Sequence, residues 1–469
     1  MGIWLRVALM RASLPPLVRY SGFYLASLFS TLSITVTPQH ISFFFFFFKE
    51  KIPLISQSYI LQSMKPYSKI LQTGYEDDYN TFLNPIRHLM HIANQFVFSY
   101  LRKLQTFSQL CSFSYRTKTV EVHKAPWYIQ DEPKFAFRGL LLDTSRHYLP
   151  INVIKQVIES MSYAKLNVLH WHIIDEESFP LEVPSYPDLW KGSYSKWERY
   201  TVEDAYDIVE GTGYSDLWPS ETCREPLDVT KNFTFDVISG ILTDMRKIFP
   251  FEFFHLGGDE VNTGCWNSTP HVRQWLQDHN MTAKDAYQYF VLRAQEIAIG
   301  KSWTPVNWEE TFNSFKESLN PRTVVHNWLG GGVCPEAVAK GFRCIFSNQG
   351  VWYLDHLDVP WEEVYNSDPL EGINDTSQQK LVLGGEVCMW GETADSSDVQ
   401  QTIWPRAAAA SARLWSKREG GFAGNISETV LPRLEYFRCL LNRRGVAAAP
   451  VTNYYARRPP VEPGSCYRQ

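Results

Sequence analysis

Short apolar runs alternate with segments of helical spacing from Thr117 onward, and this alternation limits the fold more than any other feature of the 469-residue chain. The expected helices are 151–164, 235–248, 284–299 and 401–416, and the expected strands are 137–143, 167–175, 251–256, 304–308, 323–328, 343–347 and 381–390. Such alternation predicts an α/β fold with a single (β/α)8 barrel of the TIM type. Because only seven strands can be counted, we expect the barrel to lack one strand.

Two adjacent carboxylates, Asp259 and Glu260, follow the apolar run 251–256. Gly257 and Gly258 let the backbone turn sharply there, which places both side chains at the carboxyl end of the strand. Active sites of parallel barrels lie at that end. Two neighbouring carboxyls repel each other, so the pKa of one rises and it can serve as a general acid, as glycoside hydrolysis requires. The alternative interpretation is a solvated acidic turn.

Polar and aromatic side chains also end several of the other expected strands. They are Asp175, Trp308 with Glu309 and Glu310, Trp328, and Trp390 with Glu392. A purely structural pattern would distribute such residues over both ends of the barrel, whereas an active-site rim needs them at the carboxyl ends. The sequence therefore predicts a site lined by carboxylates and indole rings.

Charge and composition exclude some classes of partner. A formal net charge of −5 argues against nucleic-acid binding, which needs a basic surplus. Fifteen of the 16 Trp residues lie from Trp127 onward, and flat aromatic rings pack against sugar rings as well as in protein cores. Neither a His/Asp/Glu cluster with metal-ligand spacing nor a CxxC pair occurs, so we expect no metal and no cofactor. The expected partner is an oligosaccharide or glycoconjugate.

Sequons and cysteines indicate an oxidising, glycosylating compartment. The chain has eight cysteines, an even number, and Asn-x-Ser/Thr sequons at Asn232, Asn267, Asn280, Asn374 and Asn425. Several sequons and an even cysteine count are typical of proteins that enter the secretory pathway. We therefore expect a glycoprotein with disulfide bonds.

The amino-terminal segment differs from the rest of the chain. Residues 14–36 are largely apolar and 43–48 form an unbroken Phe run, without a clear cleavage site. We interpret 1–105 as an atypical segment, either a signal or anchor or the remnant of an α+β domain, and 106–469 as the barrel domain. A membrane anchor in the first segment and a homodimer are both left open.

Five motifs are more specific than any of these patterns. They are FRGLLLDTSRH at 137–147, LNVLHWH at 166–172, HLGGDE at 255–260, WEE at 308–310 and GGEVCMWGE at 384–392. In them the chain from about Thr106 to Gln469 resembles the β-N-acetylhexosaminidases of glycoside hydrolase family 20, of the plant vacuolar type. The resemblance implies exo-acting removal of terminal N-acetylglucosamine or N-acetylgalactosamine from the non-reducing end, in the vacuole or outside the cell. Configuration is retained because the nucleophile is the sugar's own 2-acetamido oxygen.

The resemblance also assigns a role to each rim residue. Glu260 is the general acid and base, Asp259 orients the acetamido N–H, and Tyr353 donates its hydroxyl to the acetamido oxygen. The substrate-binding residues hold the sugar hydroxyls and enclose the acetamido methyl: Arg138, Asp175, Trp308, Trp328, Asp355, Trp390 and Glu392. By the same resemblance, disulfides join Cys223 to Cys265 and Cys439 to Cys466.

The match to the family breaks near residue 210. Family members carry a further strand ending in Pro-Gly-His, whereas here 207–210 runs directly into 211–219. The absent histidine links Asp175 to Glu260 in the family and tunes the acid. Three hypotheses stay open: an active hexosaminidase, a catalytically impaired sugar-binding relative, and a retaining glycosidase with a carboxylate nucleophile.

Overall fold

The computed structural model describes residues 33–36, 41–44, 106–107, 110–114, 116–123, 128–129, 131–201, 204, 217, 219–220, 223, 226–249, 251–416 and 426–452. The chain forms two compact units, Met1–Gln130 and Asp131–Gln469. The first unit contains two antiparallel pairs, β1 (Ser33–Val36) with β2 (Ile41–Phe44) and β3 (Cys111–Ser114) with β4 (Thr119–Val122).

The second unit is built on a sheet of seven strands, all paired in parallel. In spatial order they are β6 (Val168–His172), β5 (Phe137–Asp143), β11 (Val382–Met389), β10 (Arg343–Phe346), β9 (Val324–Asn327), β8 (Thr304–Trp308) and β7 (Phe253–His255). Each lies within or matches a strand expected from the sequence. The expected α/β barrel of the TIM type, with one strand fewer than eight among the described residues, is confirmed.

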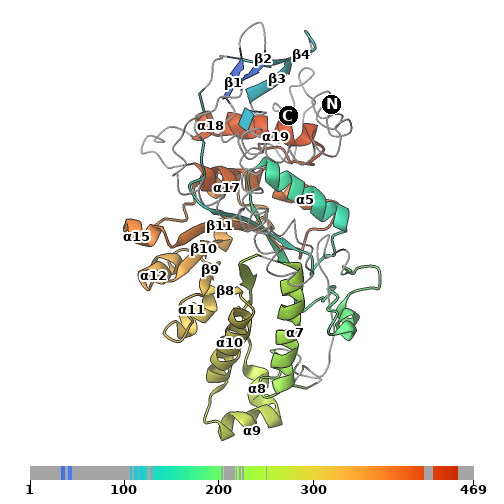
Figure 1. Ribbon diagram of the computed structural model, residues 1–469, viewed down its shortest axis with the longest axis vertical. Helices are drawn as coiled ribbons and strands as arrows, with labels where there is room; N and C mark the ends of the chain where they lie inside the picture. The colour runs from blue at the N-terminus through green and yellow to red at the C-terminus, as the bar shows by residue number, and fades with distance from the viewer. Residues whose placement is uncertain are drawn as a thin grey trace, which may run out of the picture. The chain divides into compact units, whose positions relative to one another are not determined.

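Helices alternate with these strands along the sequence, and several of them pack against the sheet (Figure 1). The longer ones are α5 (Ile151–Tyr163), α7 (Asn232–Ile248), α9 (Pro270–Asp278), α10 (Ala283–Gly300), α17 (Arg406–Trp415) and α19 (Leu431–Arg443). The shorter ones are η1 (Pro187–Gly192), α8 (Gly264–Ser268), α11 (Glu309–Phe315), α12 (Val333–Ala339), α13 (Gln349–Trp352), α14 (Trp361–Asn366), α15 (Thr376–Gln379), α16 (Val399–Ile403) and α18 (Ile426–Thr429).

Local chemistry sets several helix boundaries. Thr282 and Asp285 form a reciprocal capping box at the start of α10, which satisfies backbone N–H groups that the helix itself leaves unpaired. The single helix expected over 401–416 is wrong. It is divided into α16 and α17 at Pro405, because proline lacks the N–H that a continuous helix needs there.

The sheet has two ends, β6 and β7, which do not pair with each other in the part of the chain that the structure describes. Side chains connect the two strands instead: the imidazole of His170 in β6 stacks on that of His255 in β7, with ring centroids 4.8 Å apart. Beside this contact, an apolar cluster joins the segment after β6 to α7 and includes Leu181, Val183, Leu189, Val237, Leu242, Met245 and Trp303. Packing, not strand pairing, therefore holds β6 near β7.

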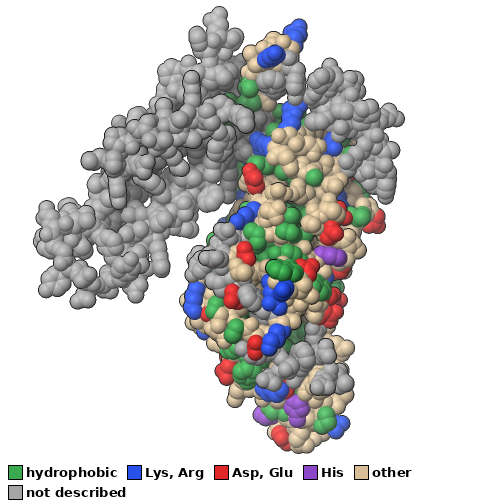
Figure 2. Space-filling model, turned by 90° about the vertical axis from the view of Figure 1, so that its right-hand side faces the viewer, with side chains coloured by type: hydrophobic (Ala, Val, Ile, Leu, Met, Phe, Trp, Pro, Cys, Tyr) green, Lys and Arg blue, Asp and Glu red, His purple; other side chains and the backbone are tan. Residues whose placement is uncertain are grey.

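The described residues on one face of the molecule do not form a continuous basic patch. On the face in Figure 2, Lys and Arg side chains are interspersed with Asp and Glu over the described residues. No helix among the described residues is both long enough and apolar enough to span a bilayer. The apolar stretch 14–36, considered as an anchor, lies outside the described residues except for 33–36.

Candidate active site

The turn after β7 carries Asp259 and Glu260 in an unusual backbone conformation. Gly257, Gly258 and Glu260 all have positive φ, of 66°, 97° and 46°. A Cβ on Gly258 would lie 2.6 Å from Thr311 Cγ2, so both the conformation and the space require glycine there. The turn is also tied to its surroundings, because the amide of Trp308 donates to the Gly257 carbonyl at 3.1 Å.

The two carboxylates of this turn have different environments. Asp259 is half-buried, and burial raises the pKa of its carboxyl, with the negative charges of Asp175 and Glu260 acting in the same direction. Glu260 is exposed at the rim. The sequence predicted a raised pKa, caused by repulsion within the pair, on the carboxyl that serves as general acid. The raised pKa is instead on Asp259, to which the resemblance gives another role, and burial is its larger cause.

Four aromatic side chains form a cage beside this turn. Ring centroids of Trp308 and Trp390 are 6.2 Å apart, those of Tyr353 and Trp390 are 5.8 Å apart, and Trp328 stacks on Tyr353 at 6.3 Å with planes only 12° apart. The rings come from the ends of β8, β9 and β11 and from the residue after α13. The four rings pack together in one cluster, as the sequence led us to expect.

Polar groups adjoin the cage. Burial raises the pKa of the Tyr353 hydroxyl, so this group stays protonated and can donate a hydrogen bond. The Oδ1 atom of Asp355 is buried and has no hydrogen-bond partner in the structure. Burial raises the pKa of Asp355 as well, and Asp143 adds to the effect. As a carboxylate, Asp355 could accept a hydrogen bond from a ligand hydroxyl at this oxygen.

Arg146 is the cationic centre of the site. Its guanidinium lies 3.1 Å from Asp143, 2.9 Å from Asp175 and 4.0 Å from Glu392, measured between the nearest nitrogen and oxygen atoms. It also lies over the ring of Trp390 at 5.2 Å. Burial alone would lower the pKa of Arg146, but these carboxylates raise it, so the side chain stays charged.

The assignment of Arg138 to sugar binding needs correction. Arg138 stands second in β5, at its amino end, whereas Asp143 ends the same strand on the site's side. The Arg138 guanidinium donates to backbone carbonyls of Phe135, Ala136 and Lys165. Arg138 therefore stabilises the opposite end of the barrel. The residue that sequence reasoning missed is Arg146, and its position after the end of the strand was the available signal.

Asp175 has two partners at the site. Its Oδ2 lies 2.6 Å from His172 Nε2 and 2.9 Å from Arg146 Nη2. Burial tends to raise the pKa of Asp175, but the hydrogen bond from His172 and the nearby guanidinium hold it below its usual value. Asp175 is thus an ionised carboxylate that orients Arg146.

Glu310 is a further titratable group at the cage. The indole N–H of Trp328 lies 3.0 Å from both carboxylate oxygens of Glu310. Burial raises the pKa of Glu310 to about 7, and the charges of Asp259 and Glu309 act in the same direction. The sequence placed Glu310 on the rim but gave it no role.

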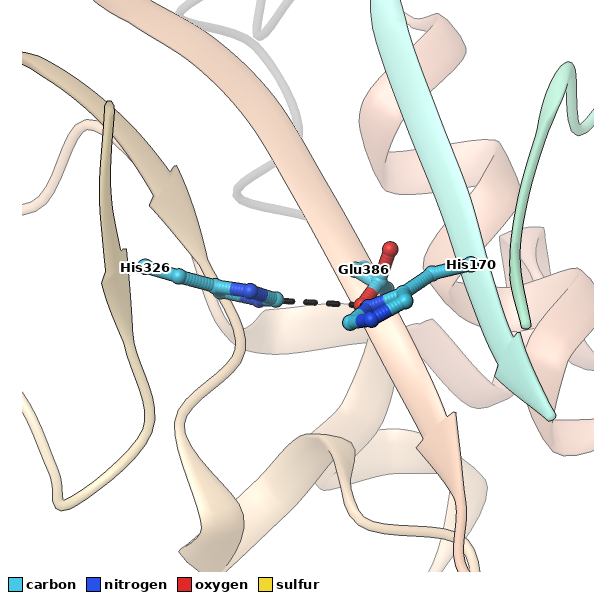
Figure 3. A group of neighbouring side chains, drawn as sticks. All are labelled: His170, His326 and Glu386. Atoms are coloured by element: carbon cyan, nitrogen blue, oxygen red, sulfur yellow. Dashed lines mark hydrogen bonds and ion pairs between the residues drawn. The ribbon is translucent and has the colours of Figure 1, made fainter. Parts of the chain in front are cut away.

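A buried group with metal-ligand chemistry lies deeper in the barrel. His170, His326 and Glu386 extend from β6, β9 and β11 toward one another, and their donor atoms lie within 4.8 Å (Figure 3). Sequence spacing missed this group because its members come from distant strands. Hydrogen bonds involve each member of the group: His170 Nδ1 lies 2.8 Å from Glu386 Oε1, and His326 Nε2 lies 2.8 Å from Ser347 Oγ. The arrangement is that of a hydrogen-bond network.

Several of the described cysteines are in disulfide bonds. Cys223 is bonded to Cys265, as the resemblance implied. Cys439 is disulfide-bonded, and its expected partner Cys466 lies outside the described residues. A bond between Cys334 of α12 and Cys344 of β10 was not expected from the sequence.

The sequons that the structure describes are accessible. Asn232, Asn267, Asn280 and Asn374 are exposed, and Asn425 lies outside the described residues. Glycans could be attached at these four positions without disturbing the core.

Comparison with known proteins agrees with this geometry. The sequence model of the glycosyl hydrolase family 20 catalytic domain matches residues 135–212 and 212–418. The chain belongs to glycosyl hydrolase family 20. Its family 20 relatives include beta-hexosaminidase 1 of Arabidopsis thaliana, 67% identical over 429 residues, which cover 86% of this chain and 79% of that one. Beta-hexosaminidase 3 of the same plant is 56% identical over 395 residues, or 80% of this chain and 73% of that one.

A solved family 20 structure is similar as well. The chitobiase of Flavobacterium johnsoniae superposes with a TM-score of 0.63 at 26% identity, over 75% of this chain and 57% of that chain. The family model, the plant relatives and this structure agree on the family and on its barrel fold.

Proposed function

We propose that this family 20 protein is an exo-acting β-N-acetylhexosaminidase that removes terminal N-acetylglucosamine or N-acetylgalactosamine from the non-reducing end of glycans. The observation that carries the proposal is the aromatic cage directly beside Asp259. A cage of Trp308, Trp328 and Trp390 fits the methyl of a 2-acetamido group, which sugars without that group lack. The names of the plant relatives support the same substrate class.

The proposed reaction uses two carboxylates and one hydroxyl. The acetamido oxygen attacks C1 while Glu260 transfers its proton to the leaving glycosidic oxygen, so the glycosidic bond breaks and an oxazolinium forms. Asp259 accepts the acetamido N–H and stabilises the positive charge of that ring. Tyr353 donates to the acetamido oxygen. Glu260 then takes a proton from water, which attacks C1 and restores the acetamide with retained configuration.

Selectivity for the chain end comes from Arg146 and its carboxylates. The guanidinium and the carboxylates of Asp355 and Glu392 can hold the hydroxyls of a terminal sugar by charge-assisted hydrogen bonds. A sugar extended at those hydroxyls would replace a hydrogen bond by a clash. The enzyme therefore acts from the end of the chain.

The test is hydrolysis of a 4-nitrophenyl N-acetyl-β-glucosaminide, with the corresponding β-glucoside as the matched control. We expect release of nitrophenol from the first and none above background from the second. Equal rates on the two would contradict a role for the cage, and no release from either would contradict the proposed function.

We further propose that the barrel has lost one strand by a deletion near residue 210. The two segments of the family match meet at residue 212. Among the described residues, the sheet ends at β6 and β7, which lie on either side of that position in the sequence. Unpaired edges leave N–H and C=O groups without strand partners. Inserting the family's strand and Pro-Gly-His between Glu210 and Gly211 should raise the melting temperature. A lowered or unchanged melting temperature would contradict the deletion.

The proposed compartment is the secretory pathway, ending in the vacuole or outside the cell. Four exposed sequons and two disulfides among the described residues support it. Enzymatic removal of N-glycans should lower the apparent mass of protein isolated from a eukaryotic host. Protein without glycans and with reduced cysteines would contradict the assignment.

A further inference from the structure

The catalytic turn depends on a contact from the strand that precedes it. With Gly257, Gly258 and Glu260 all at positive φ, the turn has no regular backbone pattern to stabilise it. The amide N–H of Gly257 donates to Nδ1 of His255 at 3.1 Å. Nδ1 must therefore be an unprotonated acceptor, and the single ring proton of a neutral His255 lies on Nε2.

That proton has a defined acceptor. His255 Nε2 lies 3.2 Å from His326 Nδ1, which makes Nδ1 of His326 the acceptor and places the His326 proton on Nε2. His326 Nε2 in turn lies 2.8 Å from Ser347 Oγ and 3.7 Å from Glu386 Oε1. The Ser347 hydroxyl donates to the backbone carbonyl of Glu386 at 2.8 Å. Every hydrogen bond in this series is thus donated in the direction away from the catalytic turn.

This chain of hydrogen bonds requires the imidazoles of His255 and His326 to be neutral. Burial lowers the pKa of His255 and of His326 well below the usual value, and the neighbouring His170 adds to both effects. A protonated His255 would present an N–H to the Gly257 N–H and remove the contact. Neutral rings in a single tautomer keep it.

The same two rings also support the cage. The indole of Trp308 stacks on His326, with centroids 4.3 Å apart and planes at 24°, and lies 4.6 Å from His255. Packing and hydrogen bonding by the two histidines are therefore separable contributions. The packing supports Trp308, and the hydrogen bonding fixes the turn that carries Asp259 and Glu260.

We propose that His255 and His326 are positioning residues: the ordered chain from Gly257 through His255 and His326 to Ser347 holds the catalytic turn, and His326 acts by fixing the tautomer of His255. This inference rests on the proposed function and deepens it. Neither histidine is assigned contact with the sugar. Their effect on the reaction passes through the position of the turn.

Two substitutions of His326 separate its two contributions. His326→Phe keeps a flat ring under Trp308 but removes the acceptor for His255, while His326→Asn loses the ring but offers its Oδ1 near the position of Nδ1. A misplaced catalytic group or a lost orienting contact costs between about tenfold and a hundredfold in rate. We therefore expect kcat of His326→Phe to fall by about tenfold to a hundredfold. The kcat of His326→Asn should fall less and stay higher than that of His326→Phe.

The affinity for N-acetylglucosamine distinguishes the turn from the cage. His326→Phe should bind this sugar almost as tightly as the original protein, so its loss appears in kcat. If His326→Asn is as slow as His326→Phe or slower, packing under Trp308 is the role of His326 and the proposal is overturned. Thermal unfolding identifies a variant that has not folded.

The tautomer of His255 gives a readout that needs no activity. Side-chain 15N spectra of folded protein, with the His255 signals assigned from His255→Gln, should show the Nε2–H form. In His326→Phe, part of the population should shift to Nδ1–H. An Nδ1–H form of His255 in the original protein would overturn the proposed series of hydrogen bonds. The Nε2–H form in a protein that hydrolyses no N-acetylhexosaminide would count against the proposed function alone.

Discussion

The guanidinium of Arg146 lies 2.9 Å from the carboxylate of Asp175, on the side of the barrel where β5 and β6 end. Arg138, eight positions earlier in the same motif, lies at the other end of β5. The first prediction compares substitutions of these two arginines. Arg146→Met should lower kcat/KM by about tenfold to a hundredfold, because each hydrogen bond between charged groups contributes roughly 1.5–3 kcal/mol.

Arg138→Met is the matched variant. It leaves buried backbone carbonyls without a donor, so the free energy of unfolding should fall by about 1–3 kcal/mol while kcat/KM of the folded enzyme stays the same. Denaturant titration and steady-state kinetics check both variants. A larger loss of kcat/KM in Arg138→Met than in Arg146→Met would restore Arg138 to the site.

This pair also shows how far the sequence alone could lead. Apolar runs bounded by glycine and polar residues located all seven strands, and the motif around Asp259 and Glu260 located the turn. Choosing between two arginines of one motif required knowing where the strand ends. Arg138 lies inside the apolar run and Arg146 beyond it, so the rule that sites lie at carboxyl ends would have selected Arg146.

The second prediction concerns pH. Burial raises the pKa of Glu310 from 4.5 to about 7 in the folded protein. The folded state therefore favours the protonated acid, and the stability it contributes is lost as pH rises from about 4.5 through about 7. Deprotonation also strengthens the hydrogen bond from the Trp328 indole, since an ionised carboxylate is the better acceptor.

NMR can follow this titration directly. The indole N–H resonance of Trp328, assigned with Trp328→Phe, should shift with a midpoint near pH 7, and the shift should be absent in Glu310→Gln. A midpoint close to 4.5 would mean that Glu310 is well solvated and that the burial argument is wrong.

The third prediction ranks the two disulfides. Cys223 and Cys265 are 42 residues apart, whereas Cys334 and Cys344 are 10 apart. In the chain-entropy model the longer loop contributes about 4 kcal/mol and the shorter about 3 kcal/mol. Paired Cys→Ser substitutions should therefore lower the free energy of unfolding more for the first pair. The reverse order in denaturant titrations would contradict the entropic account.

Other parts of the site were beyond sequence reasoning for identifiable reasons. The bond between Cys334 and Cys344 joins a helix to the next strand, and eight cysteines permit too many pairings to select it. His255 and His326 come from different strands, and their contact depends on how β7 to β9 curve. The division of the helix at Pro405 could have been predicted from the sequence, because a proline inside a helical pattern ends the helix.

The fourth prediction is that Glu260→Gln loses most hydrolysis and keeps sugar binding. The amide has the shape of the acid but cannot donate a proton to the leaving oxygen, and general-acid contributions are about a hundredfold to ten-thousandfold. The loss should be greatest for alkyl glycosides and smaller for 4-nitrophenyl glycosides, whose leaving group needs little protonation. Equal losses on both kinds of substrate would remove Glu260 from the acid role.

The central claim is that the substrate's own acetamido oxygen is the nucleophile, held by Asp259 and Tyr353 within the aromatic cage. The most direct test is kcat/KM for a series of aryl β-glucosaminides whose N-acetyl group carries zero, one, two or three fluorines. Each fluorine withdraws electrons from the carbonyl oxygen, so kcat/KM should fall steeply and steadily along the series. A rate that does not depend on fluorination would mean that a protein carboxylate is the nucleophile and would contradict the account.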